Sequence, residues 1–146
     1  MIRITTSMVA ALLAFNTAGA AAGEARATEA VRAEAREILH ASVAMQTSEG
    51  RGQVPVLAEY LAGKFKAAGF AAEDIEIRPH GETASLVVRY RGSDRQAKPI
   101  LLLAHMDVVG VEAAAWSVDP FAGQVRDGYV YGRGAIDEEG YEAEVA

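Results

Sequence analysis

The sequence contains no cysteine and only three histidines among its 146 residues. Without thiols no disulfide can form in an oxidising compartment, and any metal ion must be held by nitrogen and oxygen ligands. The chain also has no basic run. Its net charge is −6, and no aromatic residues are interleaved with clustered lysines or arginines. This composition argues against a nucleic-acid-binding surface, and no nucleic-acid partner is expected.

The chain also lacks an apolar run of the roughly 20 residues that a transmembrane helix needs. Its N-terminus nevertheless has the three zones of a secretory signal: Arg3, an apolar stretch over residues 8–15 and small residues over 17–22. We therefore expect a signal peptide over residues 1–22, periplasmic or secreted localisation, and no membrane contact after cleavage. An N-terminal membrane anchor is the alternative, which the short apolar stretch disfavours.

The 146 residues have the composition of a soluble globular protein with one modest core, and we expect that core within residues 23–146. Apolar residues recur at helical spacing over residues 29–45 and again between Pro55 and Gly69. Proline is common in the first helical turn and glycine just beyond the last, so these two residues mark the bounds of the second helix.

Three shorter segments have strand-like patterns. Apolar side chains alternate over residues 73–78 and cluster over residues 84–91, with a turn at 79–82 between the two segments. The pair Asp127-Gly128 predicts a tight hairpin between Gln124 and Tyr131. Together with the two helices these strands predict an α/β fold, a mixed sheet flanked by helices.

The most informative stretch is the apolar run Ile100–Ala104, which follows Pro99 and ends in His105-Met106-Asp107. Such a run predicts a central strand buried on both faces. In open α/β sheets the ligand crevice lies at the carboxyl ends of strands, which is where His105 and Asp107 would emerge.

Residues two apart in an extended backbone point the same way, so the His105 imidazole and the Asp107 carboxylate can meet. An imidazole that binds a metal through one nitrogen commonly donates its other N–H to a carboxylate, which orients the ring. We interpret His105 as a metal ligand and Asp107 as the residue that orients it. The alternative is a solvated loop histidine beside a capping aspartate.

His40 has no acidic or histidine partner at ligand spacing and is interpreted as a half-exposed helical histidine. His80, beside Gly81 and Glu82, is a second candidate ligand, but its turn is remote in sequence from this motif, and we interpret it as solvated.

Three motifs follow one another in this part of the chain: His-Met-Asp-Val-Val from His105, Trp-x-x-Asp-Pro-Phe from Trp116, and Asp-Gly-Tyr-x-Tyr-Gly-Arg-Gly-Ala-x-Asp from Asp127 to Asp137. In this order and spacing they resemble the N-terminal part of the co-catalytic zinc hydrolases that include aminoacylases, succinyl-diaminopimelate desuccinylase and glutamate carboxypeptidases. The resemblance implies an incomplete catalytic domain of the zinc-exopeptidase type over residues 23–146.

The same resemblance implies roles for three residues. His105 would bind one of two zinc ions, Asp107 would be the catalytic residue that orients it, and Asp137 would bridge the two ions. A shared carboxylate offsets the repulsion between two cations and sets their spacing. The implied substrate is a small peptide or an N-acyl amino acid, hydrolysed at its amide bond.

The chain departs from the family pattern after Asp137. Glu139 stands where the family usually has lysine. The pair of adjacent glutamates that family members carry a few dozen residues further on, as general base and zinc ligand, is missing from these 146 residues. Two hypotheses result. The chain is either a zinc hydrolase of this family, here catalytically incomplete, or a non-catalytic truncated product that binds metal weakly at most.

Overall fold

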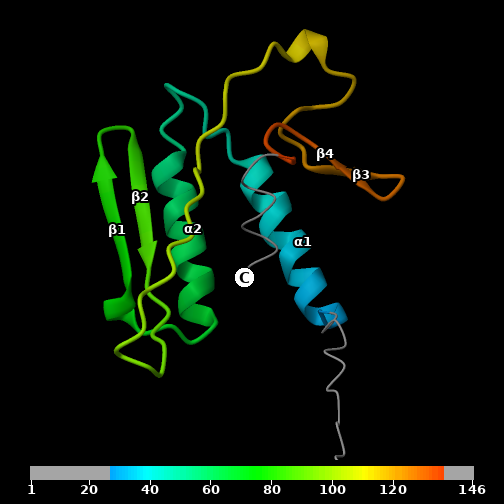
Figure 1. Ribbon diagram of the computed structural model, residues 1–146. Helices are drawn as coiled ribbons and strands as arrows, with labels where there is room; N and C mark the ends of the chain where they lie inside the picture. The colour runs from blue at the N-terminus through cyan, green and yellow to red at the C-terminus, as the bar shows by residue number, and fades with distance from the viewer. Residues whose placement is uncertain (1–26, 137–146) are drawn as a thin grey trace, which may run out of the picture.

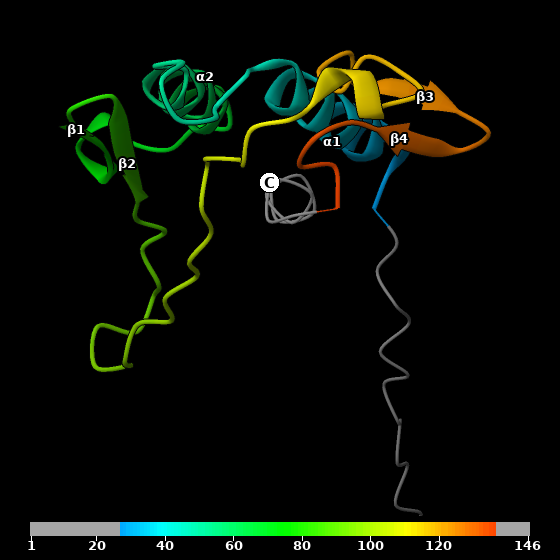
Figure 2. The same ribbon diagram turned by 90° about the horizontal axis from the view of Figure 1, so that it is seen from above.

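The computed structural model describes residues 27–136, so the expected signal peptide and Asp137 lie outside the described residues. Helices α1 (Glu29–Ala44) and α2 (Val54–Ala67) precede the strands β1 (Ile75–His80), β2 (Thr83–Val88), β3 (Gln124–Arg126) and β4 (Tyr129–Tyr131). Single 3₁₀ turns lie at η1 (Ala72–Asp74) and η2 (Ala113–Ala115). In Figure 1 the β1–β2 hairpin lies beside α2, and the β3–β4 hairpin lies beside α1; Figure 2 shows the same order from above. The predicted α/β class is confirmed.

Helix α1 begins at a conventional cap. The hydroxyl of Thr28 accepts a hydrogen bond from the N–H of Val31 at 3.3 Å, and Glu29 adds a negative charge to the first turn. The helix buries one stripe of side chains, which contains Ile38, Ser42 and Val43. Its bounds agree with the sequence prediction to within one residue.

Helix α2 ends in a complete Schellman motif. The N–H of Phe70 donates to the carbonyl of Phe65 at 3.1 Å, and the N–H of Gly69 donates to that of Lys66 at 3.0 Å. Gly69 has φ 92°, a conformation that costs glycine little, and the rings of Phe65 and Phe70 pack edge to face at 5.2 Å. The predicted stop at Gly69 is therefore confirmed, with the apolar contact that usually accompanies this motif.

The core forms where α2 meets α1 and the first hairpin. It centres on Ile38, Leu57 and Leu61, and partly buried side chains pack around it: Met45, Tyr60, Leu86 and Met106. Strand β1 pairs antiparallel with β2, with Ile77 opposite Leu86, through a turn at Gly81 and Glu82. Both strands pack against α2. Across residues 27–136, no helix combines the length and apolarity needed to cross a bilayer.

An ion pair closes the base of this hairpin. Asp74, which is 6% exposed, accepts hydrogen bonds from Arg91, the shortest being 2.6 Å from Nη2 to Oδ1. The Arg91 guanidinium holds the pKa of the Asp74 carboxyl below its usual range. The contact joins η1, just before β1, to the chain just after β2.

The second hairpin has the turn that its sequence predicts. Asp127 and Gly128 both have positive φ, 54° and 82°, as a type I′ turn requires. Val125 pairs with Val130 across the ladder.

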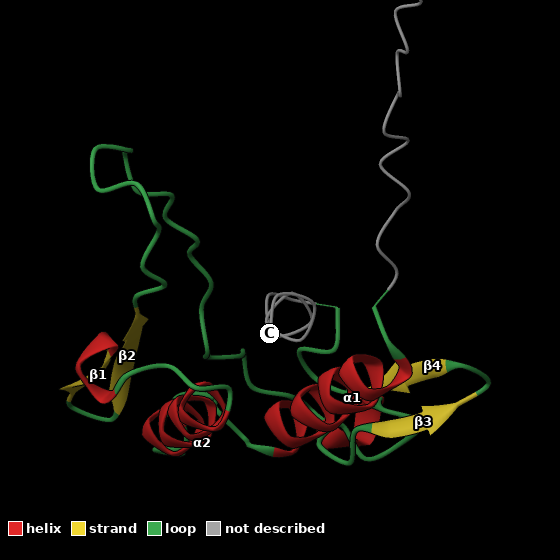
Figure 3. Cartoon of the chain, turned by 90° about the horizontal axis from the view of Figure 1, so that it is seen from below, coloured by secondary structure: helices red, strands yellow, loops and turns green. Residues whose placement is uncertain are grey.

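The predicted central strand at Ile100–Ala104 is wrong for the described structure. This segment is drawn as loop in Figure 3, and its four large apolar side chains, Ile100 to Leu103, are 72–89% exposed. A strand buried on both faces needs hydrogen-bonded neighbours and covering layers. The described strands form two separate two-stranded antiparallel sheets, β1–β2 and β3–β4, and neither ladder includes these residues. For the same reason the described residues contain no mixed sheet.

Candidate functional site

Met106 and Val108, which alternate with His105 and Asp107, fix which way this segment faces. Met106 packs against the core and Val108 is 7% exposed, so alternate side chains point inward. The two remaining side chains point outward: that of His105 is 45% exposed and that of Asp107 is 72% exposed. The extended backbone therefore places both candidate groups on one side, as period-two alternation requires.

The His105 ring is held by residue 107 in a defined way. Its Nδ1 lies 2.8 Å from the backbone carbonyl oxygen of Asp107 and 3.8 Å from the carboxylate Oδ1. A carbonyl oxygen can only accept, so in the neutral ring Nδ1 donates and the lone pair resides on Nε2. This tautomer suits metal binding through Nε2. The contact that fixes it is made by the carbonyl, while the carboxylate stays beyond hydrogen-bond distance.

The number of ligands is smaller than a zinc ion needs. Within residues 27–136, no three histidine, aspartate or glutamate side chains converge as a metal-binding group. A catalytic zinc ion takes three protein ligands and a water. The orientation of His105 thus fits a metal ligand, but the described residues do not complete a coordination sphere. Asp137 lies outside these residues, so its bridging role stays a prediction.

The other two histidines lie apart from this segment. His40 is exposed on α1, where a Cβ built on Gly123 would come within 3.0 Å of its ring, and His80 is exposed at the end of β1.

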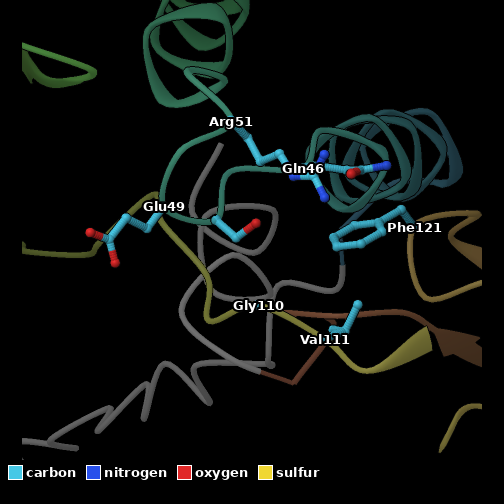
Figure 4. Close-up of a pocket in the computed structure, with 7 residues that line it drawn as sticks. Gln46, Glu49, Arg51, Gly110, Val111 and Phe121 are labelled. Atoms are coloured by element: carbon cyan, nitrogen blue, oxygen red, sulfur yellow. The ribbon is translucent and has the colours of Figure 1, made fainter. Parts of the chain in front are cut away.

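A polar cavity of about 320 Å³ lies where the α1–α2 loop faces the chain beyond Asp107 (Figure 4). The loop contributes Gln46, Ser48, Glu49 and Arg51, and the opposite side contributes Gly110, Val111 and Phe121. Glu49 points away from Val111 and Phe121 in this view. None of the motifs described above includes this loop. Its signal was the glycine pair at 50 and 52, which have φ 76° and 61° and so bend the loop sharply.

The second and third motifs contact each other directly. The backbone N–H of Arg133 donates to the Pro120 carbonyl oxygen at 2.7 Å, and the Arg133 guanidinium lies 5.4 Å from the centre of the Trp116 ring. Gly132 approaches α1 so closely that an added Cβ would lie 2.3 Å from Cγ1 of Val43. The Trp-x-x-Asp-Pro-Phe motif, the Gly-Arg-Gly motif and α1 therefore pack together immediately before Asp137.

Comparisons with known proteins identify the same segment. Residues 101–143 match the model of Peptidase family M20/M25/M40. Over 81 residues, or 55% of this chain, the sequence is 41% identical to succinyl-diaminopimelate desuccinylase from Bradyrhizobium, of which it covers 21%. Over 55 residues, or 38% of this chain, it is 47% identical to N-fatty-acyl-amino acid synthase/hydrolase PM20D1 from Xenopus tropicalis, of which it covers 11%.

The human protein of the same name is 45% identical over 58 residues, which are 40% of this chain and 12% of that protein. The chain thus spans about a tenth to a fifth of the length of these curated relatives. The resemblance inferred from the three motifs is confirmed: residues 101–143 of this chain match Peptidase family M20/M25/M40.

Proposed function

We propose that this chain carries the first metal-binding segment of a zinc-dependent hydrolase that cleaves the amide bond of a peptide or an N-acyl amino acid. The observation that carries the proposal is the His105 ring, held at Nδ1 by residue 107 within the segment that matches the peptidase family. The substrate class follows the relatives, whose names specify a desuccinylase and a hydrolase of N-fatty-acyl amino acids.

In this proposal His105 would help to hold one zinc ion, and Asp137 would help to hold that ion and a second one, as the family resemblance implies. Asp107 is a positioning residue, because its carbonyl accepts from Nδ1 and its carboxylate adds a negative charge 3.8 Å from the ring. Zinc ions in such a site polarise the scissile carbonyl and lower the pKa of a bound water.

We further propose that the 146 residues alone do not turn over substrate. Only His105 and Asp137 stand at positions that match the metal ligands of the family, which leaves most of each coordination sphere to water. A general base typically contributes 10²–10⁴-fold of rate, and none of these 146 residues stands at a position that matches the general base of the family. The alternative function is a non-catalytic product that binds metal weakly.

An assay of the purified chain with added zinc, against dipeptides and N-acetyl amino acids, tests whether these 146 residues turn over substrate on their own. We expect no turnover above a blank that contains zinc alone. Turnover that His105→Ala abolishes would show that the chain completes the site, through its own acidic C-terminal residues or through a second copy.

The roles of the two residues can be tested by zinc calorimetry on the same chain. His105→Ala should abolish the zinc binding that the wild type shows. Asp107→Asn keeps the carbonyl contact with Nδ1 and removes only the carboxylate charge, so it should weaken zinc binding by less than the roughly 10–100-fold that loss of an orienting partner costs. His80→Ala is the matched control, since His80 is exposed at the end of β1, and it should bind zinc like the wild type. An equal loss in His105→Ala and His80→Ala would refute the assignment of His105.

Export is proposed on the sequence alone, from the charged, apolar and small-residue zones of residues 1–22. Mass spectrometry of the protein from a periplasmic or secreted fraction should find a mature N-terminus near residue 23. Exported material that still begins at Met1 would refute the cleavage.

A further inference from the structure

The segment Ile100–Ala104 has no backbone partner in the described part of the chain. No backbone hydrogen bond between residues 27 and 136 reaches it, and neither ladder includes it. In Figure 1 it belongs to the yellow-green chain that crosses α2, and Figure 2 shows that chain standing away from the layer of helices and hairpins. A row of free N–H and C=O groups is a template for pairing with another extended chain.

The side chains of this segment are apolar in both directions in which they point. Ile100 and Leu102 are 89% and 72% exposed, and Leu101 and Leu103 are 76% and 82% exposed. Exposed apolar surface on unpaired backbone marks a contact surface. The pattern of the residues indicates what it contacts.

The segment is complementary to itself. Two identical strands related by a two-fold axis pair antiparallel, so the residue on the axis faces its own copy. With Leu102 on the axis, Leu101 faces Leu103 and Ile100 faces Ala104 of the second strand. Every residue of the apolar run then opposes another apolar residue.

The neighbouring positions of the axis fit less well. An axis at Leu101 would set Lys98 against Ala104, and an axis at Leu103 would set His105 against Leu101. A polar or charged side chain opposite an aliphatic one loses the apolar cross-strand contact. The composition of the run therefore favours Leu102 as the centre.

Pro99 fits the same register. Cross-strand pairs alternate between those that exchange two hydrogen bonds and those that exchange none. If Leu102 exchanges both with its copy, Ile100 and Ala104 also exchange both, and Pro99 falls at a position that donates none. A proline is tolerated in a strand where its missing N–H is not needed.

The charges that flank the run favour the antiparallel direction. Lys98 precedes the run and Asp107 follows it, and both are exposed. With the axis at Leu102, Lys98 of one copy faces residue 106 of the other and so lies one position from Asp107. Parallel pairing would instead bring like charges together, which is unfavourable.

We propose that Ile100–Ala104 is an interface with a second copy of this chain, in which the two segments pair antiparallel about Leu102. The dimer is weak, because two short strands bury less than the roughly 800 Å² per partner of a standard interface, and it forms at high protein concentration. The inference does not rest on the zinc-dependent function, since none of the paired residues is a candidate metal ligand.

Cross-linking of the full chain tests the register. The chain has no cysteine, so one introduced cysteine is its only thiol. In Leu102→Cys the two thiols meet across the axis at a Cα separation of about 5.5 Å, which a disulfide can span. Ile100→Cys is the matched control, because its copy lies four positions, or about 13 Å, along the ladder. Under mild oxidation Leu102→Cys should form the disulfide-linked dimer at least about tenfold faster than Ile100→Cys, and equal rates would overturn the proposal.

Sedimentation equilibrium tests the association without a cross-link. Leu102→Lys and Leu102→Glu set like charges opposite each other and should each weaken the dimer by about tenfold or more. An equimolar mixture should associate more tightly than either variant alone, because lysine then faces glutamate. Val125→Lys is the control: Val125 is 65% exposed in β3, outside the segment, and this variant should dimerise like the wild type.

Circular dichroism checks that each variant folds, which the exposure of Leu102 leads us to expect. A wild type that stays monomeric at high concentration would show that something other than a second copy covers the segment. An open series of species larger than the dimer would show aggregation without a defined axis. Either result would overturn the proposal, as would a mixture no tighter than its components.

Discussion

Gly132 provides the sharpest test of how the motif segments pack. Its φ is not in the left-handed region, so an alanine there meets no backbone penalty of that kind. The obstacle is contact: the new Cβ would lie 2.3 Å from Cγ1 of Val43, whereas apolar carbon atoms prefer about 3.5–4 Å. One side must therefore move by more than about 1 Å. Val43 is 2% exposed in the packed face of α1 and has little room to do so.

The expected cost of Gly132→Ala is about 1–3 kcal/mol of unfolding free energy, the usual range for an overpacked core. Val43→Ala alone should cost about 2 kcal/mol, because it removes two buried methyl groups. The double variant should cost clearly less than the sum, since the clashing Cγ1 is gone and the next atoms, the Pro120 carbonyl oxygen and Val43 Cβ, lie at 3.3 and 3.6 Å. The two changes should therefore couple favourably by about 1–3 kcal/mol.

Urea unfolding followed by Trp116 fluorescence and circular dichroism measures all three variants. Gly63→Ala is the control, because it lies within α2 and an added Cβ meets nothing within 4 Å. It should stabilise the chain by about 0.5–1 kcal/mol, as expected for alanine in place of a helical glycine. If Gly132→Ala behaves like Gly63→Ala, or if Val43→Ala does not relieve it, the close approach of the motif to α1 is wrong.

Two further predictions concern the first hairpin and the core. Hydrogen bonds from Arg78, then Arg89, lower the pKa of Glu76 from 4.5 to about 2. The resulting stabilisation is present above pH 4.5 and is lost as the pH falls towards 2, so Glu76→Gln should flatten the decline of the urea midpoint over that range. An unchanged decline would contradict this assignment. Leu57→Ala should lower the unfolding free energy by about 2–5 kcal/mol, measured by urea unfolding, because Leu57 is fully buried; a loss below 1 kcal/mol would contradict its central place.

The features that the sequence predicted well have local causes. Both helices have their signals within one turn of their ends, as in the cap at Thr28 and the stop at Gly69. The Asp127-Gly128 turn likewise depends only on two residues that tolerate positive φ. The orientation of His105 was partly predictable, since alternation places residues 105 and 107 on one side. The contact between Nδ1 of His105 and the backbone carbonyl oxygen of Asp107 was not predictable, because the types of side chain in a sequence do not indicate which backbone atoms they contact.

The cavity between the α1–α2 loop and the chain beyond Asp107 could not be found from motifs, because it joins segments that are far apart in the sequence. The loop at residues 46–52 meets Gly110 and Phe121 only through the path of the folded chain. Arg133 was noted only as part of a motif, and its buried Nε, which has no hydrogen-bond partner among the described residues, becomes visible once Trp116 and β4 are placed around it. Whether a polar atom is buried depends on all of its neighbours in space, and a sequence motif does not specify them.

The apolar run at Ile100–Leu103 predicted a buried strand that the described structure does not contain, and its exposure can be tested. Leu101 and Leu103 are 76% and 82% exposed, so replacing both with lysine should change the unfolding free energy by less than about 0.5 kcal/mol. Four exposed apolar side chains in an extended segment favour association between chains, so the same variant should lower light scattering at high protein concentration. Leu86→Lys is the control: it packs against the core and should unfold the chain. If instead the double lysine variant unfolds as Leu86→Lys does, the run is buried as a strand, and the sequence-based prediction was right.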